Sequence, residues 1–255
     1  MHRFFVRPED INNDMAVIAG DDAHHIGKVL RLEPGEEIIL CNSEGLEYKA
    51  VIQKVEKDRV CAKLLGSSPS VTEPGIKVIL YQGLPKASKM DTIIQKCVEL
   101  GISRIVPVST IRTVVRLSDK KDGEKKTARW QKIAEEAAKQ SGRGIIPQVD
   151  YPVSFDEAVK HCRADLKILL WEEEKDQSLR NILNSRSAGA DTIAVFIGPE
   201  GGLDKQEAAL AEQYGWLSAS VGPRILRTET AGMAVLAAIM YHMEEFEWKH
   251  HLPGR

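Results

Sequence analysis

The strongest constraint on the fold is a change in the hydrophobic pattern of the sequence at residues 66–75, a stretch rich in Gly, Ser and Pro. Before it, short β-branched or alternating segments are punctuated by turn residues; after it, apolar strand-like segments alternate with amphipathic helical ones. Strands separated by helices form a mostly parallel sheet covered on both faces. The sequence therefore predicts a small β-barrel domain at residues 1–70 and an α/β domain at residues 74–255.

The expected elements follow from local patterns. In the first domain we expect strands at 4–6, 15–18, 37–41, 47–55 and 59–65, with a short helix after Asp21. In the second we expect strands at 76–82, 104–108, 166–170, 192–197 and 216–221. The helices expected there lie at 89–100, 127–140, 155–162, 179–183, 205–214 and 230–246. Asp204 followed by Glu207 is typical of a capping-box helix start.

Composition excludes several classes of protein. Apolar residues make up 43% of the 255 residues and charged residues 28%, which is typical of a globular chain. The longest nearly apolar run, Ala231–Met243, is shorter than the roughly 20 residues that span a bilayer. The N-terminus lacks a signal-peptide pattern, and the four cysteines form no C-x-x-C pair. We therefore expect a cytoplasmic protein in a reducing compartment, with neither a membrane span nor a bound metal.

Charge is distributed unevenly along the chain. The net charge of −2 combines −3 over residues 1–72, +7 over residues 73–145 and −6 over residues 146–255. A basic block between acidic ones is a candidate footprint for a polyanion such as RNA. The alternative is a solvated lysine-rich face, and for residues 120–126 we favour a solvated loop.

Polar turns follow three strands of the second domain. They are residues 170–174 (LWEEE), residues 198–204 (GPEGGLD) and residues 222–232 (GPRILRTETAG). Ligands of open α/β sheets bind at the carboxyl ends of strands, although the second turn could also be an ordinary connection between a strand and a helix. No dinucleotide or P-loop glycine motif is present. In the third turn, Arg224 and Glu229 could simply pair and cap an apolar helix that must be buried.

Six segments together resemble one family. They are HRFFV and HHIGKVLRLEPGE near the N-terminus, residues 86–99 and 129–143, FIGPEGGL at 196–203 and VGPRILRTET at 221–230. In this order they closely resemble the ribosomal RNA small subunit methyltransferase E (RsmE) family of the SPOUT superfamily, over essentially the whole chain. The departures are small: Ile111 stands where an acidic residue is usual, and Gly232 where a larger residue is common.

The resemblance implies a fold and a reaction. It implies a PUA-like RNA-binding barrel, a SPOUT domain with a deep trefoil knot, and a homodimer. The implied reaction is methylation of N3 of uridine 1498 in 16S rRNA of the small ribosomal subunit, with S-adenosylmethionine as donor and no metal. The implied donor-site residues are Leu170, Trp171, Glu172, Gly198, Glu200, Gly201, Val221, Gly222, Ile225, Leu226, Arg227, Thr230 and Ala231.

Catalytic and RNA-binding roles follow from that reaction. Uridine N3 carries a proton, so Arg227 could stabilise the anion, while Glu200 or Glu229 could accept the proton if burial raises its pKa. The candidate RNA contacts are Arg3, Arg7, His24, His25, Lys28, Arg31, Lys86, Lys89, Arg112, Arg116, Gln140 and Arg143. For His24 and His25, helix capping and core packing are the alternative.

Two other classes of function stay open. A non-catalytic RNA-binding assembly factor would have lost the donor-site turns, which are intact here. The hypothesis of an enzyme that acts on a small nucleotide would not explain the presence of the β domain or of the basic block.

Overall fold

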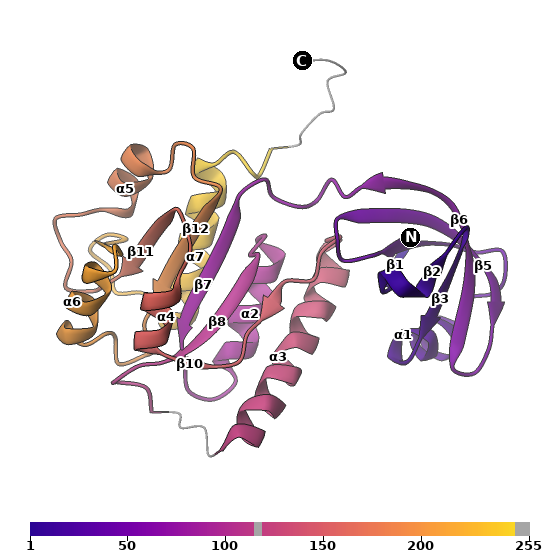
Figure 1. Cartoon of the computed structure of the whole chain (residues 1–255), viewed down its shortest axis with the longest axis horizontal. Coiled ribbons are helices and arrows are strands. Elements are labelled where there is room, and N and C mark those ends of the chain that lie inside the picture. Colours follow the sequence, from indigo (N-terminus) through magenta and orange to yellow (C-terminus); the bar gives the residue numbers. More distant parts are fainter. Residues whose placement is uncertain (115–118, 248–255) are drawn as a thin grey trace. The chain divides into compact units, whose positions relative to one another are not determined.

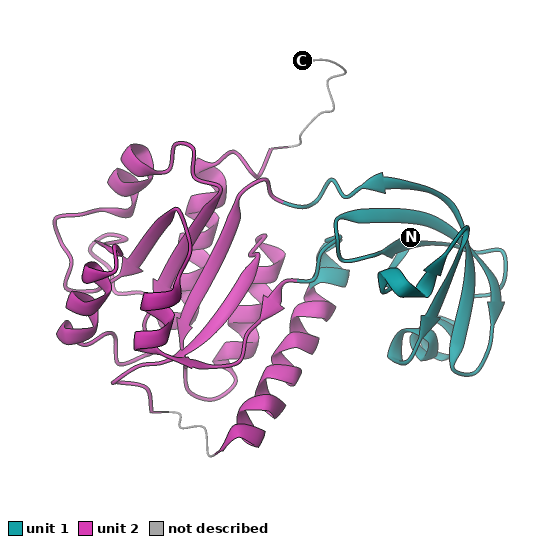
Figure 2. Cartoon of the chain, viewed as in Figure 1, with its two compact units in different colours: residues 1–73, 138–146 teal, residues 74–137, 147–255 magenta. Residues whose placement is uncertain are grey.

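The computed structural model describes residues 1–114 and 119–247, which form two compact units (Figures 1 and 2). The first unit comprises residues 1–73 together with 138–146, and the second comprises the remainder. The domain boundary expected from the linker did not include the later segment, which completes the first unit.

The first unit is built on one sheet. Its strands are β1 (His2–Phe5), β2 (Ile11–Asn12), β3 (Met15–Ala19), β4 (Glu37–Cys41), β5 (Leu46–Val55) and β6 (Arg59–Pro69). They pair in the order β1-β4-β5-β6-β3-β2, and no ladder joins β1 to β2 among the described residues. All the neighbouring pairs are antiparallel except β1 with β4. A 3-10 turn, Pro8–Asp10, precedes β2.

A short helical segment packs against this sheet. Helix α1 (Asp21–His24) continues as a π-helical turn, His25–Leu30, which ends at Arg31 in the left-handed conformation. Ala23 and Ile26 are fully buried in the core of the unit, against apolar residues of β1, β3, β4, β5 and β6. The helix expected after Asp21 is therefore confirmed.

Residues 138–146 are held in the first unit by a buried ion pair. Arg143 Nη2 donates to Glu73 Oε2 at 2.6 Å, and both side chains are largely buried. Glu73 Oε1 also accepts the backbone N–H groups of Gly144 and Ile145, at 2.9 and 3.1 Å. Because its guanidinium is buried against Glu73, the prediction that Arg143 contacts RNA is wrong.

The second unit is a parallel sheet. Its strands are β7 (Lys77–Gly83), β8 (Arg104–Ser109), β9 (Gln148–Val149), β10 (Val153–Ser154), β11 (Leu166–Leu170), β12 (Thr192–Ile197) and β13 (Leu217–Ala219). The order is β10-β8-β7-β12-β11-β13, with β9 also on β8, and every pairing among the described strands is parallel. The expected α/β class is confirmed, whereas the trefoil knot stays a prediction.

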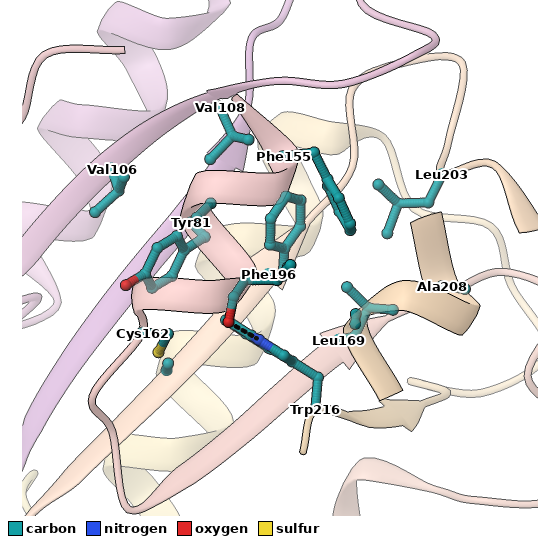
Figure 3. Packing of buried hydrophobic residues seen from close by; sticks show 14 residues of the cluster. Tyr81, Val106, Val108, Phe155, Cys162, Leu169, Phe196, Leu203, Ala208 and Trp216 are labelled. Carbon is teal, nitrogen blue, oxygen red and sulfur yellow. Dashed lines mark hydrogen bonds between the residues drawn. The ribbon is translucent and has the colours of Figure 1, made fainter. Parts of the chain in front are cut away.

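Helices cover both faces of this sheet (Figure 1). They are α2 (Lys89–Glu99), α3 (Lys120–Ser141), α4 (Phe155–His161), α5 (Leu179–Arg186), α6 (Lys205–Gln213) and α7 (Thr228–His242). Side chains alternate across each strand. On β12, Ala194 and Phe196 join the cluster under α4 and α6, where Tyr81 and Trp216 pack edge to face with centroids 5.4 Å apart (Figure 3).

Two sequence expectations about helices need correction. Residues 120–126, favoured as a loop, form the first turns of α3, because Asp119 accepts the N–H of Asp122 and Lys126 pairs with Asp122. Helix α7 was expected to be buried, yet one of its faces is exposed as far as Tyr241. No helix of the described residues is long and apolar enough to cross a membrane.

Gly232 lies in α7, in an ordinary helical conformation. A Cβ placed there would meet Leu80, Gln82 and Cys97 at 3.6–3.9 Å, which is normal van der Waals contact. Since glycine in a helix interior costs stability, we expect Gly232→Ala to raise the free energy of unfolding by about 0.5–1 kcal/mol. Denaturant unfolding measures this.

Gly123 of α3 is the matched control. A Cβ at Gly123 would lie 2.5 Å from Tyr151 Oη, so that ring must move and Gly123→Ala should bring no gain. An equal gain at both glycines would contradict the packing described here.

Candidate active site

The site lies at the carboxyl ends of four neighbouring strands of the parallel sheet. Gln82, Ile197, Leu170 and Ala219 lie side by side in register at the carboxyl ends of β7, β12, β11 and β13. The residues that follow leave the sheet together at the same edge. Three of these loops enclose a cavity of about 980 Å³, at the upper end of the range for small-molecule sites.

The cavity collects residues that are far apart in sequence. It is lined by Lys89, Leu170, Trp171, Glu172, Glu174, Lys175, Ser178, residues 197–202, residues 219–228 and Ala231. Every residue predicted for the donor site lines it except Thr230, which is exposed on α7. Of the catalytic candidates, Arg227 and Glu200 line it and Glu229 does not.

Two glycines allow the loops to approach closely. Gly202 has a φ of +70°, and a Cβ there would collide with the carboxylate of Glu172 from the neighbouring loop. At the end of β7, a Cβ on Gly83 would lie 2.6 Å from Pro199 Cδ. A side chain at Gly83 would push the 198–202 turn away, because it would also meet the backbone of Pro199 and Gly198, and a side chain at Gly202 would be strained and would displace the Glu172 carboxylate.

The walls combine apolar surface with a few polar groups. Leu170, Ile197 and Val221 contribute apolar side chains, while Glu172, Lys175 and Ser178 contribute polar ones. A ligand with an apolar body and a few hydrogen-bonding groups fits such walls.

A lysine joins the two candidate carboxylates. Lys89 Nζ lies 3.0 Å from Glu200 Oε1 and 3.3 Å from Glu229 Oε2, so α2 is tied both to the 198–202 turn and to α7. Glu200 also accepts the backbone N–H of Lys86, at 3.1 Å from its Oε1. The sequence placed Lys89 among the RNA contacts; no local pattern could reveal a pairing between positions 89, 200 and 229.

This arrangement fixes the charge state of Glu200. Partial burial acts to raise the pKa of Glu200, but hydrogen bonds from Lys89 and from backbone N–H groups outweigh it and hold the pKa below its ordinary value. The hypothesis that burial raises the pKa of Glu200 toward neutrality is therefore wrong. The pairing of Arg224 with Glu229 is also wrong, because Arg224 is exposed and Glu229 faces Lys89.

A second set of contacts fastens residues 110–113 to the same turn. Arg112 donates to the carbonyl of Gly201 at 3.1 Å and to Asp204 Oδ2 at 3.2 Å. The buried Glu207 accepts the N–H of Ile111 at 2.8 Å and closes the predicted capping box with Asp204. Arg112, predicted to bind RNA, thus supports the turn from outside the cavity.

The remaining predicted RNA contacts that the structure describes are distributed over both units. His24, His25, Lys28 and Arg31 are all exposed on α1 and the turn that follows it. Arg3 is largely buried against Glu47, and Arg7 pairs with Asp10. Lys86 and Gln140 are exposed, and Arg116 lies outside the described residues.

Known protein families match both units. An RNA methyltransferase domain model matches residues 72–240, and an RNA methyltransferase PUA domain model matches residues 18–65. The ribosomal RNA small subunit methyltransferase E of Bacillus subtilis is 39% identical over 232 residues, covering 89% of this chain and 90% of the relative. The chain belongs to the ribosomal RNA small subunit methyltransferase E family.

Other members of the family agree over similar lengths. The Mesomycoplasma hyopneumoniae member is 31% identical over 92% of this chain and 97% of its own length. The crystal structure of the Neisseria gonorrhoeae member bound to S-adenosyl methionine has a TM-score of 0.84 and is 31% identical, covering 94% of this chain and 97% of that one.

The Lys89 contact makes a prediction about pH. We expect the Glu200 carboxyl to titrate below its ordinary pKa of about 4.3, and Lys89→Met to raise that pKa. Because the folded-state pKa is lowered, the stability that the contact contributes is present above the unfolded-state pKa and is lost as the pH falls through the folded-state value. Carboxyl-carbon NMR titration measures this.

Lys205→Met is the control, since Lys205 pairs with Glu173 and not with Glu200. An unchanged Glu200 pKa in Lys89→Met would contradict the assignment.

Proposed function

We propose that this chain transfers the methyl group of S-adenosylmethionine to N3 of uridine 1498 in 16S rRNA. The observation that carries the proposal is the cavity at the carboxyl ends of β11, β12 and β13, lined by the segments that resemble the family. The donor bound to the Neisseria gonorrhoeae relative supports the same ligand here. We place the activity in the cytoplasm, on the small ribosomal subunit.

The residues of the cavity fit this donor. Its volume and apolar walls suit an adenosine with a flexible tail. The bound donor supplies an electrophilic methyl group on a sulfonium. Leu170, Val221 and Leu226 would enclose it, and the close-packed 198–202 turn would fix its orientation.

The chain's own residues must then prepare the acceptor nitrogen. Arg227 is exposed at the start of α7 and lines the cavity, so its guanidinium can stabilise negative charge that develops on the uracil ring. Glu200 is held as a carboxylate by Lys89 and Lys86, which makes it a poor proton acceptor. Glu229 Oε2 is also paired with Lys89, at 3.3 Å, and Glu229 does not line the cavity, so we assign the N3 proton to neither of these carboxylates.

We propose the RNA contacts of each unit from its exposed basic residues. His24, His25, Lys28 and Arg31 form an exposed basic segment, which we propose contacts phosphates. Lys86 near the cavity would approach the RNA beside the target uridine.

Methylation of small ribosomal subunits tests the proposed function. Subunits from cells that lack this gene, incubated with labelled S-adenosylmethionine, should yield 3-methyluridine by nucleoside mass spectrometry. Arg227→Ala should lower the rate about 100- to 1,000-fold, as loss of a charge-stabilising donor does.

Arg163→Ala is the control, because Arg163 is exposed before β11, at the opposite edge of the sheet. Absence of 3-methyluridine with wild-type protein would contradict the proposal.

We also propose a homodimer that covers α7. Its exposed face presents Thr230, Ala234, Ala238 and Tyr241 at helical spacing, with Ile225 90% exposed nearby. Exposed apolar side chains along one face of a helix are typical of an association site.

Sedimentation tests the homodimer. Wild-type protein should sediment as a dimer at micromolar concentration, and Ala234→Glu should shift it to monomer. A wild-type monomer would contradict the homodimer.

A further inference from the structure

A fully buried glutamine lies beneath the cavity, at the end of β7. Gln82 has no exposed surface, although it follows a run of apolar residues in that strand. Its Nε2 donates to the carbonyl of Gly83 at 3.0 Å and to Thr228 Oγ1 at 2.9 Å. Thr228 Oγ1 lies 2.6 Å from the carbonyl of Gly198. These contacts join three segments of the chain.

The direction of each hydrogen bond in this network is determined. The carbonyl of Gly83 can only accept, so the NH₂ group of Gln82 must face it, and the same group donates to Thr228. The Thr228 hydroxyl already accepts from Gln82, so its single hydrogen points to the carbonyl of Gly198. Reversing the amide would leave two carbonyl oxygens facing each other, and the single hydrogen of the Thr228 hydroxyl could then serve only one of two oxygens, that of Gln82 or that of Gly198.

The network connects two walls of the cavity. Gly198 begins the 198–202 turn, and Thr228 is the first residue of α7, immediately after Arg227. The short hydrogen bond between Thr228 and Gly198 holds these two walls at a fixed separation. The buried Gln82 orients the Thr228 hydroxyl by donating a hydrogen bond to it. Gln82 is fully buried, so loss of the Thr228 hydroxyl would leave its NH₂ group with one partner fewer in a place closed to solvent, which is costly.

We infer that Thr228 is a positioning residue, oriented by Gln82, which holds the Gly198 turn and the start of α7 at the separation that donor binding requires. The inference rests on the proposed binding of S-adenosylmethionine in this cavity. In this inference Thr228 makes no direct bond to the donor. It acts by fixing the positions of Gly198 and of Arg227, the residue before it. The hydroxyl, and not the bulk of the side chain, carries this role.

Isosteric variants separate the hydroxyl from the side-chain volume. Titration calorimetry with S-adenosylmethionine should show Thr228→Val binding about tenfold more weakly, while Thr228→Ser stays within about threefold of wild type. The KM for the donor should rise in the same proportion, with kcat changing less. Gln82→Met should weaken binding similarly, and the double variant should lose less than the two single losses combined, since both act on one bond.

Ser187→Ala is the matched control. Ser187 is also buried, and its hydroxyl bonds Leu183 and His242 at the far end of α7, away from the cavity. Its loss should lower the melting temperature without changing donor affinity, as a merely structural hydroxyl does.

The possible outcomes distinguish failure of this inference from failure of the proposed function. Donor binding to Thr228→Val that equals wild type, or equal weakening in Thr228→Ser and Thr228→Val, would overturn the inference while leaving the proposed function intact. Wild-type protein that binds no donor would overturn the proposed function and the inference together.

Discussion

The parallel pairing of β7, β12, β11 and β13 is the constraint on which the rest of the site depends. Parallel strands end at one edge, and here Gln82, Ile197, Leu170 and Ala219 end in a single register row. Three loops must therefore leave the sheet side by side, whatever their sequences. Their glycines then decide how closely the loops pack, as the contact between Gly202 and Glu172 shows. A cavity with walls from three distant segments follows from the sheet.

Electrostatic contacts give those loops fixed positions. Lys89 links the 198–202 turn to α7, and Arg112 supports the same turn from its other side. Each of these cations contacts a carboxylate next to a wall of the cavity and so helps to hold the turn, whereas the sequence had predicted both as RNA contacts. The turn is consequently fastened by side chains from α2, from the segment after β8 and from α7.

The sequence predicted the elements better than the contacts between them. Strands 37–41, 166–170 and 192–197 have the predicted bounds, because their apolar runs end at clear turn residues. The start of α3 was missed because its first turns are charged and are stabilised by ion pairs, which carry no apolar periodicity. Gln82 did leave a signal: a polar residue in an apolar strand must find buried partners.

Hydrogen exchange with and without S-adenosylmethionine tests the central claim most directly, namely that three loops of the second unit form one donor site. Donor binding should slow exchange at residues 170–175, 198–202 and 220–228 together, and leave the strands of the first unit unchanged. Protection of only one of these loops, or protection confined to other parts of the chain, would contradict the account.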